Sequence, residues 1–412
     1  MFRGWWIVLT AFLSQFASSG ASGWVFGLLV LEMQADLGAS RSVIVGVLVL
    51  ERLLGGVSGA VLGPYVDRHG TRLLTTASAL IAGGCLFALA TVNAPWQPYI
   101  IWAVFGLTLP GLATVAPIAA ISSWFVRHRT RAIVTYTFGG AVAGLVLAPM
   151  MSVVSGEFGW RTVWVVMGLM FWVIAPLAWV AVRHHPEDVG LTPDGIAEPP
   201  AVADAARSAV VNADASWTVS EALHSKAFWL LTGGFTLTML PASSIFIHMS
   251  SYVQSKGFST EEAAAAVSVY GFGAVFGRVF WGVVVGRGGL HRSLVLWGVM
   301  YGVSIILYAL PASLLAIYAT TIFLGIAVAG SLQFRAQAFP DYFGRQIVGA
   351  LVGYSSAIGT LAGAAAPLIV AVAFDLTGAY SGIFIAFGIA CLAASVGFLF
   401  SRPVRASQPN LA

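Results

Sequence analysis

A single arginine, Arg278, lies in the middle of the apolar run AAAAVSVYGFGAVFGRVFWGVVVG, residues 263–286. An arginine at the centre of a membrane helix costs roughly 2.5–3.5 kcal/mol on insertion scales, so such residues usually face a cavity or a substrate path. A guanidinium stays charged in a low dielectric and forms a two-pronged pair with a carboxylate. We therefore favour Arg278 as an anion site. The alternative is a structural arginine held by backbone carbonyls or by a partner carboxylate.

Glu51 is the one acid deep within an apolar run, and Arg52 follows it directly. Neighbouring residues of a helix point about 100° apart, so these two side chains do not pair side by side. Glu51 is a candidate proton-coupling residue. The alternative, which we favour, is that Glu51 permanently neutralises an arginine elsewhere in the fold.

Three further polar residues lie in apolar runs. Gln333 and Arg335, near the inner end of the run 313–338, are candidates for a second anion contact. Snorkelling of the Arg335 charge to the membrane interface is an equal alternative. His248, near the outer end of the run 227–252, has a titration range suited to proton exchange. We keep His248 as a candidate substrate contact, although a lone histidine at this depth is more often interfacial.

The composition decides which solvent surrounds the elements that carry these residues. Of the 412 residues, 58% are hydrophobic and 9% are charged, whereas soluble domains have about 25% charged residues. Lipid must therefore cover the apolar surface. With 20 basic and 16 acidic residues, the chain is too sparsely charged for a nucleic-acid footprint. Cys85 and Cys391 both lie in apolar runs, so no disulfide framework is indicated.

About 20 apolar residues cross a bilayer as a helix, and twelve stretches of this kind occur along the chain. They are residues 5–32, 43–65, 74–93, 99–125, 132–155, 160–182, 227–252, 263–286, 293–311, 313–338, 347–373 and 380–401. We expect the first stretch to be a retained span, because it is longer than a signal-peptide core. The prediction is an all-α membrane protein of twelve transmembrane helices. Its parts are a six-helix bundle over 1–182, a cytoplasmic linker over 183–226, and a six-helix bundle over 227–412 that ends in a short cytoplasmic tail.

The two predicted bundles resemble each other in sequence. Gly63 leads into the loop after the second span, and Gly282 leads into the loop after the eighth. Phe125 follows the fourth span, and Phe343 follows the tenth. The interval from Gly63 to Gly282 matches the interval from Phe125 to Phe343 almost residue for residue, which indicates an internal duplication. Parallel repeats of this kind are typical of transporters that bind their substrate near the membrane midplane.

The basic residues predict the orientation. With the N-terminus inside, fourteen of them fall on the cytoplasmic side, whereas only Arg41, Arg161 and Lys256 fall outside. The fourteen are Arg3, Arg68, Arg72, Arg127, Arg129, Arg131, Arg183, Arg207, Lys226, Arg287, Arg292, Arg345, Arg402 and Arg405. This positive-inside bias places both termini and the linker in the cytoplasm of an inner or plasma membrane.

The loop after the second span has the spacing of a gate. It contains Gly63, Asp67, Arg68, Gly70 and Arg72 in GPYVDRHGTR. Glycines permit close approach and tight turns, while an aspartate can pair with a basic group or a helix N-terminus. The segment resembles the G-x-x-x-D-R-x-G-x-R loop of the major facilitator superfamily, which implies that it holds the cytoplasmic face closed. The alternative is a plain surface turn with solvated charges.

A finer resemblance is to the monocarboxylate transporter branch of that superfamily, including bacterial monocarboxylate and oxalate–formate transporters. The segments that carry it are GASGWVFGLLVLEM, SSWFVRHRTRA, GWRTVW, HMSSYVQSKGFSTEEAA, AVFGRVFWG, PDYFGRQIVGALVG and AAAPLIVAVAFDLTGAYSGIF. By position, Arg278 matches the arginine with which this family binds the substrate carboxylate.

Two departures from that family concern proton coupling. Ala274 stands where mammalian members carry an aspartate, and Gly27 or Leu28 occupies the region of their first-span lysine. We list Leu28 as a substrate-lining candidate on this basis. Both departures leave proton symport and anion exchange open.

The sequence excludes several classes of function. It contains no phosphate-binding loop, no metal-spaced His/Cys set and no nucleophile–base pair, so we expect neither an enzyme, nor a cofactor, nor ATP-driven pumping. We predict a monomeric secondary transporter of a small organic anion that works by alternating access, and among such anions we favour a monocarboxylate. Its expected partners are that substrate and membrane lipid, with a proton as a further candidate. The alternative is an exporter of hydrophobic or amphipathic compounds.

Overall fold

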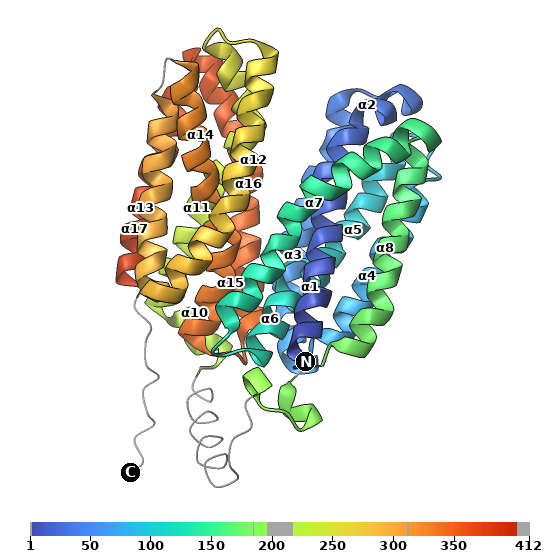
Figure 1. Ribbon diagram of the computed structural model, residues 1–412, viewed down its shortest axis with the longest axis vertical. Helices are drawn as coiled ribbons and strands as arrows, with labels where there is room; N and C mark the ends of the chain where they lie inside the picture. The colour runs from blue at the N-terminus through green and yellow to red at the C-terminus, as the bar shows by residue number, and fades with distance from the viewer. Residues whose placement is uncertain (1, 184, 196–216, 311–312, 402–412) are drawn as a thin grey trace. The chain divides into compact units, whose positions relative to one another are not determined.

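The computed structural model describes residues 2–183, 185–195, 217–310 and 313–401 (Figure 1). The middle of the predicted linker, 196–216, and the predicted cytoplasmic tail, 402–412, lie outside the described residues. Within those residues the fold is all-α, with no strand.

The helical segments of the first part of the chain are α1 (Gly4–Ser19), η1 (Gly20–Val25), α2 (Phe26–Leu37), α3 (Arg41–His69), α4 (Thr71–Leu89), α5 (Gln97–Leu112), α6 (Val115–Trp124), α7 (Arg129–Phe158), α8 (Trp160–Ala181), η2 (Pro186–Val189) and η3 (Pro193–Gly195). Those of the second part are α10 (Val219–His224), α11 (Lys226–Ser255), α12 (Thr260–Gly288), α13 (Leu290–Ala309), α14 (Leu314–Val328), α15 (Gly330–Phe343), α16 (Val348–Thr377) and α17 (Ser381–Phe400).

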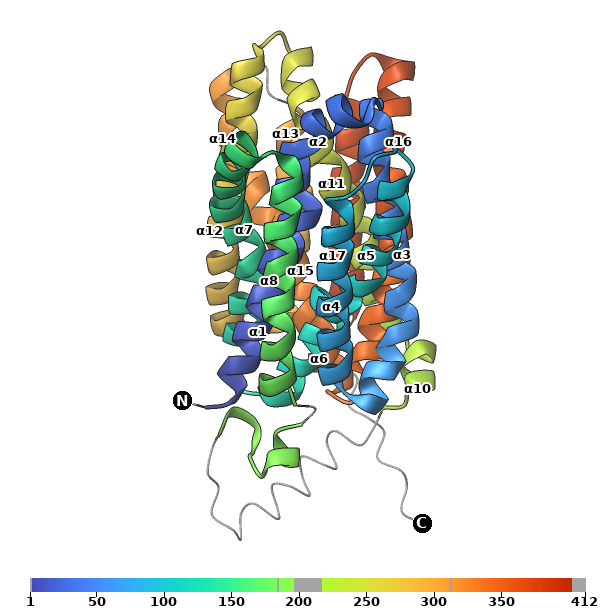
Figure 2. The ribbon, with the colours of Figure 1, turned by 90° about the vertical axis from the view of Figure 1, so that its right-hand side faces the viewer.

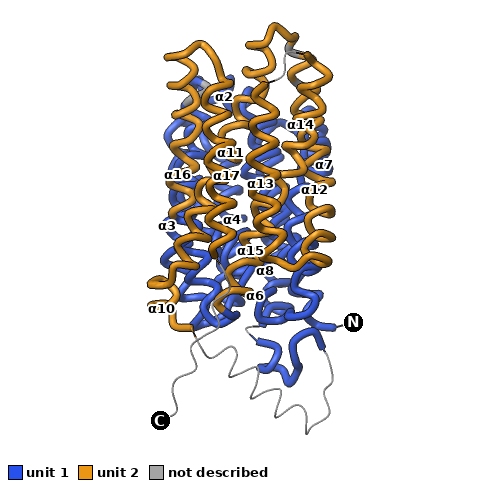
Figure 3. The backbone as a smooth tube through the Cα atoms, turned by 90° about the vertical axis from the view of Figure 1, so that its left-hand side faces the viewer, with its two compact units in different colours: residues 1–216, 344–357 blue, residues 217–343, 358–412 orange. Residues whose placement is uncertain are grey.

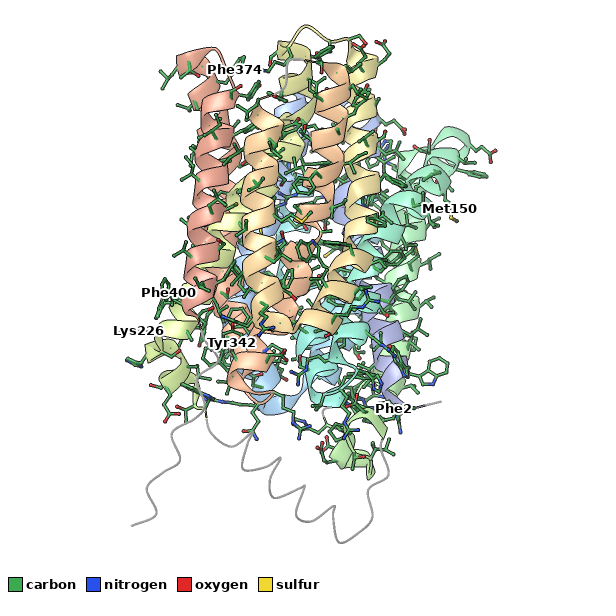
Figure 4. All side chains as sticks on the ribbon, turned by 60° about the vertical axis from the view of Figure 1, so that its left-hand side comes forward. Phe2, Met150, Lys226, Tyr342, Phe374 and Phe400 are labelled. Carbon is green, nitrogen blue, oxygen red and sulfur yellow. The ribbon has the colours of Figure 1, made fainter. Side chains whose placement is uncertain are left out.

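The described residues contain twelve helices that are long and apolar enough to cross a membrane, as predicted. Three of these spans are composite: Gly4–Leu37 joins α1, η1 and α2, Gln97–Trp124 joins α5 and α6, and Leu314–Phe343 joins α14 and α15. Apolar side chains also cover outward faces of the helices. Met150 is 54% exposed and Phe400 is 68% exposed, and both project away from their helices in Figure 4. In a membrane, lipid would cover these apolar faces.

The turns between spans repeat along the chain. Gly70 and Gly159 have φ angles of 82° and 81°, and Gly289 and Gly378 have φ angles of 76° and 70°. The interval from Gly70 to Gly289 equals the interval from Gly159 to Gly378, and both equal that from Gly63 to Gly282. A residue with φ in this region is glycine by preference, because a Cβ atom is disfavoured there. The duplication therefore extends to backbone conformation.

The chain divides into two compact units (Figure 3). Unit 1 comprises Met1–Ser216 and Gly344–Ala357, and unit 2 comprises Trp217–Phe343 and Ile358–Ala412. The first residues of α16 thus group with unit 1, although they follow α15 in sequence.

Corresponding helices pair in the two units. In unit 1, α3 packs against α5 and α4 packs against α8, as Figure 1 shows. In unit 2, α12 packs against α14 and α13 packs against α17. These are the same pairings of second with fourth span and of third with sixth span in each unit, so the packing repeats along with the sequence.

Candidate functional site

Arg278 lies in α12, on the part of the helix that packs against α14 and α15. Trp281 anchors α12 by donating its indole N–H to the carbonyl of Ile326 in α14, at 2.9 Å. The Arg278 guanidinium turns back along its own helix, and Nη1 donates to the carbonyl of Ala274 at 3.0 Å. The phenol of Tyr270, two turns earlier, lies within electrostatic range of the guanidinium. A backbone carbonyl carries no full charge, so this contact does not supply a counter-ion.

The ion pairs found among the described residues do not include Arg278. They join His128 to Asp194, Arg161 to Asp36, and Arg345 to Glu187. The permanent acidic partner that would make Arg278 purely structural is therefore missing from the part of the chain that the structure describes.

Gln333 supports Arg278 from α15 through the backbone. Its amide is fully buried, and in the amide orientation that gives both atoms a partner it donates to the Arg278 carbonyl at 3.3 Å and accepts from the Gly282 N–H at 3.1 Å. Both groups belong to one turn of α12, so Gln333 fixes the helix that carries the guanidinium. The structure thus gives Gln333 a positioning contact, whereas the sequence had placed it among direct substrate contacts.

Arg335 is turned into unit 2. Its side chain is 7% exposed, its guanidinium lies 5.5 Å from the centre of the Phe235 ring, and Nη2 is 3.5 Å from the Phe235 carbonyl. A methyl group on Gly359 would lie 3.1 Å from Nη2, so the charge packs on the backbone of α16. This burial differs from the snorkelling alternative. Like Arg278, Arg335 has no carboxylate partner among the described residues.

His248 and Leu28 make packing contacts. Nε2 of His248 lies 3.1 Å from the carbonyl of Pro367 in α16, which it can reach only as a donor, and the His248 ring is 5.8 Å from that of Tyr380. Leu28 is half-buried and packs against the apolar core of unit 1.

Asp67, at the end of α3, caps the first turn of α16. Its Oδ1 accepts from the backbone N–H of Gly349 and its Oδ2 accepts from that of Ala350, both at 2.7 Å. The first N–H groups of a helix have no partner inside the helix, and the helix dipole favours a negative charge there. Both carboxylate oxygens of Asp67 are therefore satisfied by the start of span 11, which belongs to unit 1.

The other residues of this loop divide into those that shape the contact and one that does not. A methyl group on Gly63 would collide with the carbonyl of Gly349, so only glycine permits this approach of α3 to α16. Gly70 forms the turn with φ of 82°. Arg72 donates to the Trp179 carbonyl at 2.8 Å and stacks on the Trp179 ring at 3.8 Å. Arg68 is exposed and has no hydrogen bond or ion pair among the described residues.

Sequence reasoning missed a second contact at the start of span 11. Arg345 donates to Glu187 Oε1 and to the Ser123 carbonyl, at 3.0 Å each. Glu187 belongs to the linker, where the sequence predicts only soluble chain. The signal available beforehand was weak, because a surface acid in a polar segment is usually solvated.

Glu51 has a hydroxyl partner where an arginine was expected. Its side chain is 1% exposed, Oε1 accepts from Ser22 Oγ at 2.6 Å, and Oε2 has no partner among the described residues. Arg52 is exposed. The arginine partner that we favoured from sequence is therefore absent from the described part of the chain.

Ser22 sits in η1, a π-helical segment that interrupts span 1. Such segments are rare and often occur at functional sites, because the extra residue per turn redirects side chains. The same segment carries Trp24, which donates to the Gly140 carbonyl in α7 at 3.3 Å. A signal for this site was present in the sequence, since Ser22 belongs to the first-span motif GASGWVFGLLVLEM.

No group of three or more His, Cys, Asp and Glu side chains that could hold a metal ion occurs within the described residues. The groups assembled here are instead suited to binding an anion, holding a proton and capping a helix. Together with twelve membrane-spanning helices, they define a multi-pass membrane protein of the transporter type.

The family is shown by sequence comparison. The sequence profile of the Major Facilitator Superfamily matches residues 11–296, and the chain belongs to this family. The chain is therefore a transporter and not an enzyme.

Three relatives illustrate the range of the family around this chain. An MFS-type transporter of Aspergillus fumigatus is 26% identical over 58% of this chain, which spans only 55% of that relative. The 4-hydroxybenzoate transporter PcaK of Pseudomonas putida is 26% identical over 79% of this chain and 76% of its own length. Monocarboxylate transporter 13 of Bos taurus is 23% identical over 97% of this chain and 89% of its own length, which supports the predicted branch.

Among solved structures, the proton:xylose symporter XylE bound to 6-bromo-6-deoxy-D-glucose superposes with a TM-score of 0.78. It is 13% identical and covers 96% of this chain and 94% of its own. This similarity confirms the predicted major facilitator fold.

Proposed function

We propose that this protein is a secondary transporter of a small organic anion, with a monocarboxylate as the favoured substrate and Arg278 as the residue that binds the carboxylate. The observation that carries the proposal is the Arg278 guanidinium, half-buried in span 8 with a backbone carbonyl but no described acid as its partner. An arginine in a low dielectric gains from a bidentate carboxylate because both partners stay charged and planar. Two of the relatives are named for carboxylates, 4-hydroxybenzoate and monocarboxylates.

In this mechanism the substrate carboxylate supplies the counter-ion that the described residues do not offer Arg278. Gln333 holds the helix turn from Arg278 to Gly282 in place, so the guanidinium has a defined position before the substrate arrives. Arg335 is the second positive charge of unit 2 and would receive a further anionic or polar group of the substrate. His248 and Leu28 would line the path of the substrate's remaining atoms.

Coupling to protons is proposed for Glu51. A buried carboxyl inside a membrane span is a functional candidate by default, and the described residues offer Glu51 a hydroxyl rather than a cation. Ser22 can donate to an ionised carboxylate or accept from a protonated one. Protonation of Glu51 would thereby change its hydrogen bond with Ser22 in the π-helical segment of span 1.

Alternating access would follow from the gate on α3 and α4. Asp67, Gly63 and Gly70 would stabilise the conformation in which α16 starts against α3, and Arg72 would hold α4 to α8. Arg68 is proposed as a peripheral member of this gate. A ligand shifts such an equilibrium only by its different affinity for the two conformations.

For the arrangement in the cell, we propose an inner-membrane monomer with both termini in the cytoplasm. The proposed domains are the bundles 1–182 and 227–412, joined by the cytoplasmic linker 183–226. The excess of basic residues on one side of the membrane supports this orientation.

A thermal-shift panel on the purified protein tests the proposal. It compares aliphatic monocarboxylates, hydroxylated aromatic acids, amines and neutral aromatics. A bound ligand stabilises the folded state by about 2.7 kcal/mol at 100 times its Kd. We expect at least one carboxylate to raise the melting temperature, and the Arg278→Ala variant to lose that shift. Stabilisation by neutral or cationic compounds alone, unchanged in Arg278→Ala, would favour the exporter.

A further inference from the structure

The linker segment 185–195 is folded onto unit 1, and we call this segment the strap. It contains η2 and η3, drawn in light green at the end of unit 1 that bears the N-terminus (Figure 2). Its start is capped internally, because Asp188 accepts from the backbone N–H of His185 at 3.0 Å. Gly190, with φ of 70°, ends η2. The strap is thus an ordered element in a linker for which the sequence predicts only soluble chain.

The first anchor of the strap is Glu187. Its carboxylate pairs with Arg345, whose second nitrogen donates to the Ser123 carbonyl at the end of α6, each at 3.0 Å. The Arg345 side chain is only 11% exposed. Arg345 lies just before α16, whose first turn is capped by Asp67. Glu187 and Asp67 therefore hold the same short stretch of chain from two sides.

A small cavity connects these two contacts. Its lining includes Asp67 and Thr71 from α3 and α4, Arg345 from the start of span 11, and His185 from the strap. The strap therefore closes over the place where α16 meets α3, and does not pack on a remote face of unit 1.

The second anchor is Asp194. Its carboxylate accepts from three successive backbone N–H groups, those of Val126 at 3.1 Å, Arg127 at 2.7 Å and His128 at 3.1 Å. The His128 ring lies 3.2 Å away as a fourth partner. The Asp194 side chain is 2% exposed. These N–H groups lie just before α7, and Asp194 is the partner that the described residues show for them.

The backbone of Asp194 shows that this contact is enforced by its surroundings. Asp194 has φ of 61°, and it is the one described residue other than glycine with a positive φ. This region is unfavourable for a residue with a Cβ atom and persists where surrounding contacts over-determine it. The next residue, Gly195, packs under the ring of Phe2, which Figure 4 labels beside the strap.

We infer that the strap is a lock, in which Glu187 and Asp194 stabilise the conformation with α16 capped by Asp67. Release of the strap would remove Glu187 from Arg345 and loosen the start of span 11, so the strap would regulate how readily the transporter leaves this conformation. The effect on turnover rests on the proposed transport function. The effect on the start of span 11 does not.

Hydrogen–deuterium exchange of the full-length protein in detergent tests the lock without any substrate. The Glu187→Gln variant should exchange about fivefold faster at the amides of Gly349 and Ala350, because it removes one charge of a partly buried ion pair. Asp194→Ala should speed exchange at 126–128 by about tenfold or more, since three bonds to a charged acceptor are lost. The control is Glu157→Gln, which removes an exposed acid at the far end of α7.

Two outcomes would overturn the lock. One is exchange at Gly349 and Ala350 in Glu187→Gln that matches the Glu157→Gln control. The other is unchanged exchange at 126–128 in Asp194→Ala. If Asp194→Ala fails to fold, Asp194→Asn carries the test, because asparagine tolerates a positive φ and keeps one acceptor oxygen. A failed ligand panel would contradict the transport proposal while leaving this measurement intact.

Discussion

The charges of the two units are satisfied in opposite ways. In unit 1, the carboxylates of Asp67 and Asp194 accept from two and three backbone N–H groups at the starts of helices. In the described part of unit 2, the guanidiniums of Arg278 and Arg335 contact backbone carbonyls and an aromatic ring but no carboxylate. A charge whose hydrogen bonds are complete holds a conformation, whereas a buried charge without a counter-ion is open to a ligand. The difference separates the proposed gate from the proposed binding site.

The same difference separates Glu51 from Asp67 and Asp194, the two capping acids of unit 1. One of its oxygens accepts from Ser22 and the other has no partner among the described residues. By this criterion Glu51 belongs with the arginines of unit 2, as a group that we propose exchanges partners during function, although it lies in unit 1.

The largest expected effect is at Arg278, a charge with no carboxylate partner among the described residues. Arg278→Ala should weaken binding of the identified carboxylate by about 30-fold or more, because losing one partner of a buried charge pair costs about 2 kcal/mol or more. Arg278→Lys keeps the charge but loses the planar fork, so it should be impaired to a smaller degree. Binding is measured by thermal shift and uptake in vesicles. Arg287→Ala, at an exposed arginine of the same helix, is the control.

The Arg278 variant should remain folded, since removing an unpaired charge also removes its desolvation cost. Carboxylate uptake at the normal rate by well-expressed Arg278→Ala would contradict the proposal that Arg278 binds the substrate carboxylate.

Asp67 is a charge whose hydrogen bonds are complete. The Asp67→Asn variant should lower turnover by about tenfold while leaving substrate affinity nearly unchanged. The amide nitrogen of asparagine would face a backbone N–H, so at least one bond to Gly349 or Ala350 is lost, and the conformational equilibrium shifts. Initial uptake rates over a range of substrate concentrations separate the two quantities.

Arg68→Gln sharpens this test, because Arg68 belongs to the same loop but has no described partner. Its effect on turnover should be smaller than that of Asp67→Asn. Weaker binding with unchanged turnover in Asp67→Asn would contradict the gate.

For Glu51, the glutamine variant should lose the dependence of net uptake on the pH gradient while it still exchanges substrate across the membrane. Glutamine keeps the shape and an acceptor for Ser22 but cannot release a proton. Ser22→Ala should retain the gradient dependence in weakened form. The measurement is uptake into vesicles with and without an imposed pH difference. A gradient-driven accumulation in Glu51→Gln equal to that of the parent would remove Glu51 from the coupling pathway.

The smallest expected effect concerns the pH dependence of the strap. Burial raises the pKa of Asp194, but the N–H donors of 126–128 and the His128 ring outweigh it, so the pKa lies below its ordinary value of 3.8. A carboxyl with a lowered folded pKa stabilises the fold above its unfolded pKa and loses this contribution as the pH falls through the folded pKa.

The melting temperature of the parent should therefore exceed that of Asp194→Asn at neutral pH. This difference in melting temperature should narrow once the pH falls below about 4. Scanning calorimetry from neutral to acidic pH measures it. A melting-temperature difference that stays constant over this range would show that the charge of the Asp194 carboxylate does not contribute to the stability difference.

Much of the architecture followed from the sequence alone. Twelve apolar stretches specify twelve spans because a lipid-facing helix must be apolar along its length, and this condition is local. The interval between Gly63 and Gly282 reappears between the glycine turns at Gly70 and Gly289, because duplicated chain keeps its turn residues. Arg278 was identifiable since a charge in a long apolar run stands out wherever the helix packs.

What only the tertiary structure decided is which polar groups meet. Asp67 and Gly349 are 282 residues apart, and Ser22 and Glu51 are 29 apart, so no local pattern links either pair. For this reason the arginine partner that we expected for Glu51 is absent from the described residues, and the sequence placed Glu187 and Asp194 only within a predicted cytoplasmic linker. Periodicity and composition report what each helix buries, whereas the partners of a buried charge depend on the packing of helices distant in the chain.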